Sequence, residues 1–246
     1  MRVLPIAIAL TVASCGTCGT HGAELPTRSG ACFDGQVKIE RFCIDKYEAY
    51  VVELREDGEH PHSPYDVIGD LRVRAKVAPN VAPQAYISQV QAKGACANAG
   101  KRLCKAEEHL RACRGKTEDF YPYGGRVYKK GVCNEGKGSF IAAAHGMDFK
   151  NRSYAEFNDP KLNQMENGLA KTGAFAQCVS PDGVFDLVGN LHEWVDEPSG
   201  NRGHFHGGWY GDAEQNGPGC HYVTSAHEIT YHDYSTGFRC CADAVE

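Results

Sequence analysis

Residue types that could bind a redox metal gather in the last third of the chain. His204 and His206 alternate along an expected strand and therefore share one face, and Asp212 and His221 follow a short distance along the chain. Two histidines with one carboxylate are the ligands of many non-haem iron sites. One interpretation is therefore a metal-dependent (iron or copper) oxidase or oxygenase with these four candidate catalytic residues. The alternative is that they are ordinary exposed or hydrogen-bonded surface residues.

A second group of possible metal ligands lies just upstream of these histidines. Asp186 and Glu193 flank a tight Val-Gly-Asn turn at residues 188–190. Two carboxylates together with turn carbonyls form the oxygen-rich set that Ca²⁺ prefers. We therefore predict structural calcium as a cofactor at this turn. Alternatively, Asp186 caps the turn and Glu193 is solvated.

Short elements must position these residues. Residues 36–44 have the pattern of a strand, and Cys32 and Cys43 flank an expected hairpin. Helices are predicted over residues 83–98 and 105–114, with residues 56–64 as a loop. From Gly115 onward, glycines, aromatics and short apolar runs alternate without a long helical period. The pattern predicts one loop-rich α+β domain without an internal linker.

Composition and charge exclude several protein classes. Apolar residues make up 42% of the 246 residues and charged residues 23%, which is typical of a globular protein rather than a disordered or fibrous one. The net charge is −5 and no basic run occurs, whereas sequence-independent nucleic-acid binders need clustered Lys and Arg. We therefore expect no nucleic-acid partner.

The N-terminal residues predict export and membrane anchoring. An apolar run follows Arg2 and is too short to cross a membrane, which is typical of a signal peptide. It ends in Val-Ala-Ser-Cys at residues 12–15, which resembles the lipobox of bacterial lipoproteins. Residues 1–14 would then be removed, Cys15 would carry the lipid, and residues 15–30, rich in Gly, Thr and Ser, would form a flexible tether. The alternative is ordinary signal cleavage nearby.

Twelve cysteines favour an exported, disulfide-bonded protein of the cell envelope, facing the periplasm or the cell surface. If Cys15 is lipidated and Cys18 is left over in the tether, ten cysteines remain for five disulfides in the domain at residues 31–246. The residues alone leave about 945 pairings open. Zinc is disfavoured because no two cysteine pairs stand at ligand spacing.

Five motifs, in order, span nearly all of the mature chain. They are Phe-Cys-Ile-Asp-Lys-Tyr-Glu at 42–48, Gly-Lys-Arg-Leu at 100–103 with Ala-Cys-Arg-Gly at 112–115, Tyr-Pro-Tyr-Gly at 121–124, Phe-Asp-Leu-Val-Gly-Asn-Leu-His-Glu-Trp at 185–194, and Gly-Gly-Trp at 207–209 with Gly-Phe-Arg-Cys at 237–240. In this order and spacing the chain resembles the formylglycine-generating enzyme (sulfatase-modifying factor) family. The resemblance implies an irregular, loop-rich α+β fold of the C-type-lectin-like superfamily.

The resemblance also implies disulfide pairings. Two bridges of the family map to Cys96–Cys240 and Cys113–Cys220. By elimination, the other three pairs are assigned as Cys104–Cys241, Cys133–Cys178 and Cys32–Cys43. The adjacent Cys240 and Cys241 would point to opposite faces of a strand and so reach different partners.

The family binds calcium at two places, and matching positions exist here for both. The first set comprises the side chains of Asp186 and Glu193 and the carbonyls of Gly189 and Leu191. The second set comprises Asn134, the carbonyl of Glu135, and Asp148, although residues 136–147 match the family poorly.

The family's copper site is where this chain departs from the pattern. Formylglycine-generating enzymes oxidise a substrate cysteine with Cu(I) held by two cysteines shortly after a Gly-Gly-Ser segment, and soft thiolates suit Cu(I). Here Gly-Gly-Trp at 207–209 is followed only by Cys220, which matches a structural bridge, and the first copper ligand would fall near Asp212. In addition, His109 stands where the family has Trp. Both copper cysteines are therefore missing, so we do not expect the copper-cysteine chemistry.

Three functions remain open. The first is a lipid-anchored binding or assembly module of the cell envelope, with an envelope protein, peptide or glycan as its ligand. Four aromatic residues suit such contacts but equally suit packing in the core: Trp209, Tyr210, Tyr222 and Tyr231. The second is the iron- or copper-dependent oxidase with a rearranged histidine site. The third is a purely structural envelope lipoprotein.

Overall fold

The computed structural model describes residues 27–28, 30–148 and 150–246. The predicted signal peptide and the predicted lipid-carrying Cys15 lie outside the described residues, as does most of the predicted tether. In the part of the chain that is described, no helix is long and apolar enough to cross a bilayer.

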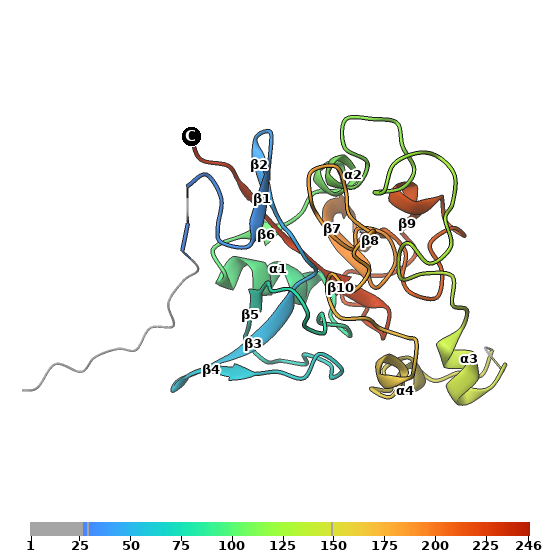
Figure 1. Cartoon of the computed structure of the whole chain (residues 1–246). Coiled ribbons are helices and arrows are strands. Elements are labelled where there is room, and N and C mark those ends of the chain that lie inside the picture. The colour runs from blue at the N-terminus through green and yellow to red at the C-terminus, as the bar shows by residue number, and fades with distance from the viewer. Residues whose placement is uncertain (1–26, 29, 149) are drawn as a thin grey trace, which may run out of the picture.

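Three small sheets form the scaffold (Figure 1). The first has the strand order β1 (Gln36–Ile39), β2 (Phe42–Asp45), β11 (Cys240–Asp243), β6 (Arg102–Leu103). The second has the order β10 (Thr236–Phe238), β7 (His192–Ser199), β8 (Arg202–His206), β9 (Val223–Thr224). The third has the order β4 (Gly58–Pro61), β3 (Tyr50–Arg55), β5 (Val73–Lys76). Strands β10 and β7 are parallel, with Gly237 opposite Glu193.

Short helices connect these sheets. They are α1 (Gln89–Asn98), α2 (Ala106–Arg114), α3 (Phe140–His145), α4 (Tyr154–Phe157) and the 3₁₀ turns η1 (Leu162–Gln164) and η2 (Gly219–His221). Helix α1 packs on β5, while α3 and α4 contact each other at the lower right of Figure 1. The mixture of small sheets, short helices and long loops confirms the predicted α+β class.

Local chemistry explains where the two predicted helices begin. The first was expected from residue 83 but starts at Gln89, because Tyr86 has φ = +55°, which no helix accommodates. Ser88 then caps the helix by accepting from the backbone N–H of Gln91. The second helix begins at Ala106, within one residue of the prediction.

Two predictions for the N-terminal strands had different outcomes. The hairpin is confirmed, because β1 and β2 pair around a turn in which Glu40 has φ = +54°. The prediction of a loop over residues 56–64 is wrong in part, since β4 forms there and pairs with β3. Glu59 of β4 binds Arg74 (2.6 Å) and Lys76 (2.8 Å) of β5, and these ion pairs explain how a polar segment is held in the sheet.

Five disulfides cross-link the described domain. They join the same residues as the pairs assigned above, namely Cys32–Cys43, Cys96–Cys240, Cys104–Cys241, Cys113–Cys220 and Cys133–Cys178. Successive residues of β11 are bonded to α1 and to the β6–α2 connection, so this central strand is held from two directions.

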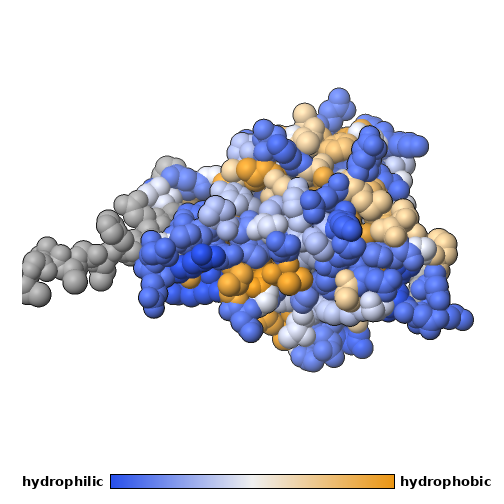
Figure 2. Space-filling model, turned by 90° about the horizontal axis from the view of Figure 1, so that it is seen from below, coloured by the Kyte–Doolittle hydropathy of each residue, from blue (hydrophilic) through white to orange (hydrophobic). Residues whose placement is uncertain are grey.

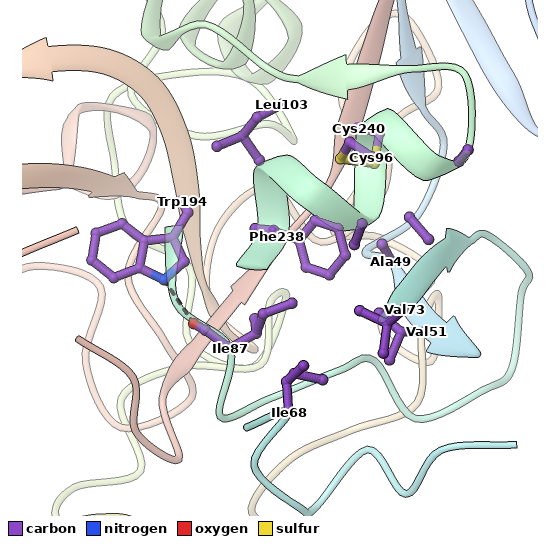
Figure 3. Close-up of a cluster of buried hydrophobic side chains, with 14 of the residues drawn as sticks. Ala49, Val51, Ile68, Val73, Ile87, Cys96, Leu103, Trp194, Phe238 and Cys240 are labelled. Atoms are coloured by element: carbon purple, nitrogen blue, oxygen red, sulfur yellow. Dashed lines mark hydrogen bonds between the residues drawn. A yellow bond between two sulfur atoms is a disulfide. The ribbon is translucent and has the colours of Figure 1, made fainter. Parts of the chain in front are cut away.

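The largest buried cluster lies between α1, the β3–β5 sheet and β7 (Figure 3). Trp194 of β7 is 1% exposed, and its indole N–H donates to the carbonyl of Ile87 at 2.8 Å. Phe205 packs edge-on against the indole at 4.8 Å between ring centroids. This cluster fixes β7 and β8, the strands that carry Glu193, His204 and His206.

We expect Trp194→Phe to lower the unfolding free energy by about 1–3 kcal/mol, because it deletes buried ring atoms and one hydrogen bond. Chemical denaturation would measure the loss. Val90→Ala, on the exposed surface of α1, is the matched control and should change stability by less than about 0.5 kcal/mol. Equal effects of the two substitutions would show that the indole does not anchor the core.

Candidate functional site

The loop after β8 occupies the position where the resemblance places the copper ligands. The start of this loop requires glycine at position 208. A Cβ on Gly208 would lie 2.5 Å from the backbone of Ala213, and φ of Gly208 is +74°. Asp212 caps the loop by accepting from the backbone N–H groups of Glu214 (3.1 Å) and Gln215 (3.2 Å). Its carboxylate therefore holds a turn together.

No described cysteine near this loop carries a free thiol. Cys220 follows it in η2 and is bonded to Cys113 of α2. All ten cysteines within the described residues are in disulfides. The described domain therefore offers no thiolate to bind Cu(I).

The two histidines of β8 have different environments. His206 is 6% exposed, its ring centroid lies 5.4 Å from that of His109, and neither of its ring nitrogens has a hydrogen-bond partner. Burial, reinforced by His109, lowers the pKa of His206 to about 3, so this imidazole is neutral at pH 7. His204 is half-buried, and its Nδ1 lies 3.2 Å from the carboxylate of Glu197.

The four candidate catalytic residues do not form a metal site. His221 packs edge-on against Phe120, with 5.2 Å between ring centroids. Asp212 is engaged in its turn, as described above. Among the residues that the structure places, no three His, Cys, Asp or Glu side chains come together in a way that could hold a metal. The set His204, His206, Asp212 and His221 therefore does not fit a two-histidine, one-carboxylate iron centre.

At the predicted first calcium site, Glu193 already has a cationic partner. Its carboxylate accepts from Nε (2.6 Å) and Nη2 (2.5 Å) of Arg239, and both side chains are 1% exposed. Nε2 of His109 lies 3.2 Å from the same carboxylate. Burial alone would raise the pKa of Glu193, but Arg239 and His109 outweigh it and lower this pKa to about 2. Glu193 is therefore an ionised partner of a buried guanidinium.

Two more buried acids adjoin this pair. Asp186 accepts from the backbone N–H of Gly173 at 2.7 Å, and burial raises its pKa to about 6. Glu48 accepts from the backbone N–H of Leu191 at 3.1 Å and from the amide of Asn190 at 2.5 Å. Burial raises the pKa of Glu48 well above its usual range, and the neighbouring acids add to the shift. Glu48 thus orders the turn at residues 189–191.

These contacts do not fit the predicted calcium ligands as they are placed. Both oxygens of Glu193 are occupied by Arg239, and one oxygen of Asp186 is occupied by a backbone N–H. A calcium ion held by Asp186, Gly189, Leu191 and Glu193 would have to share the Glu193 carboxylate with the guanidinium of Arg239 or displace it. Calcium at this turn stays a prediction, and Arg239 is the alternative against which it must be tested.

The second predicted calcium set has one feature that suits a cation. The amide of Asn134 donates to the carbonyl of Gly168 (3.1 Å) and to Asn190 (2.8 Å), while its Oδ1 is buried without a partner. Asp148, in contrast, is exposed and accepts from Asn151 at 2.8 Å. The orphaned oxygen of Asn134 fits a cation, but Asp148 is engaged at the surface.

Comparison with known families shows to which family the chain belongs. The family model described as the sulfatase-modifying factor enzyme 1-like domain matches residues 20–244. The chain belongs to this family. No curated protein matches the sequence of this sulfatase-modifying-factor-like chain.

Three solved structures illustrate what the chain is similar to. The Major Tropism Determinant I1 variant superposes with a TM-score of 0.51 at 13% identity, covering 90% of this chain and 55% of that one. PvdO from Pseudomonas aeruginosa has a TM-score of 0.48 at 14% identity, covering 82% of this chain and 80% of PvdO. CarF has a TM-score of 0.43 at 14% identity, covering 83% of this chain and 87% of CarF. The sulfatase-modifying-factor-like chain thus spans about half the length of the tropism determinants. The fold implied by the sequence motifs is confirmed.

The sulfatase-modifying-factor-like domain also has a surface cleft of about 410 Å³ that the sequence did not single out. Tyr154 of α4 and His227, Tyr231 and His232 of the β9–β10 connection line it. Tyr231 is the aromatic residue predicted for ligand contact that lies here.

The other three aromatics predicted for ligand contact lie elsewhere. Tyr210 and Tyr222 are buried, at 0% and 3% exposure, so for these two the packing alternative holds. Trp209 is half-buried and packs edge-on against Tyr210 and Tyr234.

Proposed function

We propose that this chain is a ligand-binding or assembly domain of the cell envelope, without the copper-thiolate chemistry of formylglycine-generating enzymes. The observation that carries the proposal is the oxidised state of all ten cysteines in the described domain. The cysteine that follows the Gly-Gly-Trp segment is bonded to α2. Copper-thiolate chemistry at this loop would require the chain to give up a structural disulfide.

The remaining motifs of the family serve the fold. Arg239, from the Gly-Phe-Arg-Cys motif, binds Glu193 and also donates to the backbone carbonyls of Asp45 (3.0 Å) and Phe185 (2.9 Å). Lys101, from the Gly-Lys-Arg-Leu motif, pairs with buried Asp45 at 2.7 Å. These motifs therefore join distant segments into one scaffold, as a binding domain requires.

The proposal also covers location. Five disulfides indicate an oxidising compartment, consistent with an exported protein. We propose that lipid on Cys15 holds the chain at a membrane surface of the cell envelope. Mass spectrometry of the N-terminal peptide from membranes would test this; an unmodified N-terminus beyond residue 15 would contradict the anchor.

The experiment for the central proposal supplies the purified, non-reduced chain with Cu(I), O₂ and a cysteine-containing peptide. We expect no conversion of the peptide cysteine to an aldehyde and no copper retained after desalting. The same chain after mild reduction is the positive control, because freed thiolates bind Cu(I). Aldehyde formation by the non-reduced chain would refute the proposal. The iron-dependent alternative is not proposed, because no three His, Cys, Asp or Glu side chains of the described residues come together as a metal site.

A further inference from the structure

The 410 Å³ cleft is built by two segments far apart in the chain. The hydroxyl of Tyr154 donates to the carbonyl of His232 at 2.6 Å and accepts from its backbone N–H at 3.0 Å. Nδ1 of His232 lies 2.7 Å from Oδ1 of Asn158. Helix α4 and the segment before β10 are therefore fastened together by three hydrogen bonds, 74–78 residues apart in sequence.

The other wall of the cleft is equally well fixed. The carbonyl of His227 accepts from Gly203 of β8 at 3.0 Å, and the backbone N–H of Ile229 donates to Asn201 at 3.2 Å. The ring of His227 stacks on Tyr231 at 3.9 Å between centroids, and the Tyr231 hydroxyl donates to buried Asp233 at 2.6 Å. A rigid wall of this kind lowers the entropy lost on binding.

The aromatic rings offer a stacking surface. Tyr154 is 49% exposed, and its ring lies 5.9 Å from Tyr231 and 5.4 Å from His232, inclined at 51° and 58°. Its hydroxyl is committed to the backbone, so the exposed part of the side chain presents ring carbons. Such a surface suits the C–H face of a sugar ring or another flat apolar group.

Polar groups beside the rings are suited to neutral partners. Burial lowers the pKa of both His227 and His232, so both rings are neutral at pH 7. Since Oδ1 of Asn158 can only accept, Nδ1 of His232 carries the proton and Nε2 is left as an acceptor. Ala226, Glu228 and Thr230 line the rest of the cleft and are exposed. The described residues that line it include no Lys or Arg, and the nearby guanidinium of Arg202 donates to the carbonyl of Ala226.

We propose that this cleft binds a neutral carbohydrate, with a sugar ring stacked on Tyr154 and sugar hydroxyls bonded to His232 and Glu228. The inference rests on the proposed binding function and assigns it a place and a ligand class. Aromatic faces together with neutral acceptors and a single carboxylate match a polyhydroxylated, uncharged ligand. An acidic glycan would meet the carboxylate of Glu228, and the lining offers it no cation.

The test titrates the purified full chain with cellotetraose and chitotetraose as neutral probes and a heparin tetrasaccharide as the acidic probe. We expect at least one neutral probe to bind and the acidic one to bind more weakly. Tyr154→Ala should weaken neutral binding by about tenfold or more, whereas Tyr154→Phe, which keeps the ring but loses the two hydrogen bonds to His232, should weaken it much less. His232→Ala should also weaken it. Tyr128→Ala, an exposed tyrosine outside the cleft, is the control and should bind like the unmodified chain.

Three results would overturn the inference. They are no binding of either neutral probe by folded protein, tighter binding of the acidic probe, and neutral binding that survives Tyr154→Ala and His232→Ala. Circular dichroism and melting temperature establish that each variant is folded. None of these results affects the proposed function, whose failure would appear separately as aldehyde formation in the copper experiment.

Discussion

Glu193→Gln should lower the unfolding free energy by about 3–5 kcal/mol, because it leaves the guanidinium of Arg239 buried without its anionic partner. Both side chains are 1% exposed, so water cannot replace the lost contact. Removing calcium should not alter the loss, since the partner of Glu193 is a side chain of the protein itself. Denaturant titrations in excess calcium and in excess chelator would measure both values.

Glu118→Gln provides the matched control for this substitution. Glu118 pairs with Arg114 at 3.2 Å but is 72% exposed, so its loss should cost no more than about 1 kcal/mol. A large effect of Glu193→Gln in calcium together with none in chelator would favour the predicted calcium site instead. In that case Arg239 would take up the position described here only when the metal is absent.

Removing the Cys96–Cys240 and Cys104–Cys241 bridges together should cost about 6.3 kcal/mol, which is about 1 kcal/mol more than the sum of the two single losses of about 2.7 kcal/mol each. While one bridge remains, the other closes a loop of only about 10 residues. The loop is short because Cys96 is close to Cys104 in the sequence and Cys240 is adjacent to Cys241. When both are absent, the shortest closed path runs through Cys113–Cys220 and spans about 30 residues. The second loss should therefore exceed the first.

Denaturant titrations of the two double-alanine variants and of the quadruple variant would measure this excess. Replacing Cys32 and Cys43 is the control, because that bridge spans 11 residues near the N-terminal edge and should cost about 3 kcal/mol in either background. If the losses of unfolding free energy for Cys96–Cys240 and Cys104–Cys241 were strictly additive, or if neither bridge contributed, the cross-linking of β11 described here would be contradicted.

The resemblance and local patterns predicted much of the scaffold. Helix α2 and the β1–β2 hairpin follow from short-range signals, and the disulfides join the assigned pairs. The start of α1 was misplaced because the left-handed backbone of Tyr86 depends on its tertiary setting, where its N–H donates to the carbonyl of Asp233. A pattern of apolar residues does not contain that contact.

The site was harder to predict, because its decisive contacts join distant segments. Asp186 and Glu193 resemble calcium ligands when the turn between them is read alone. The parallel pairing of Gly237 with Glu193 brings Arg239 to the same place, 46 residues further along the chain. Likewise, the cleft depends on Tyr154 reaching His232, 78 residues away. Neither contact has a local signature in the sequence.

The exposed surface carries both hydrophilic and apolar areas. The face shown in Figure 2 is mainly hydrophilic, with apolar residues gathered in small areas. Exposed large apolar residues of the domain include Val67, Leu71 and Val90. Small apolar areas of this kind are common on the surfaces of folded proteins.

The most direct test of the central claim is a count of free thiols. The exported chain would be denatured without reduction, alkylated, digested and mapped by mass spectrometry. If the chain is a binding domain without copper-thiolate chemistry, the ten cysteines of residues 31–246 should appear only in the five disulfides described here. Stoichiometric alkylation of Cys113 and Cys220 would contradict this claim, because it would place two free thiols beside the loop where the family binds copper.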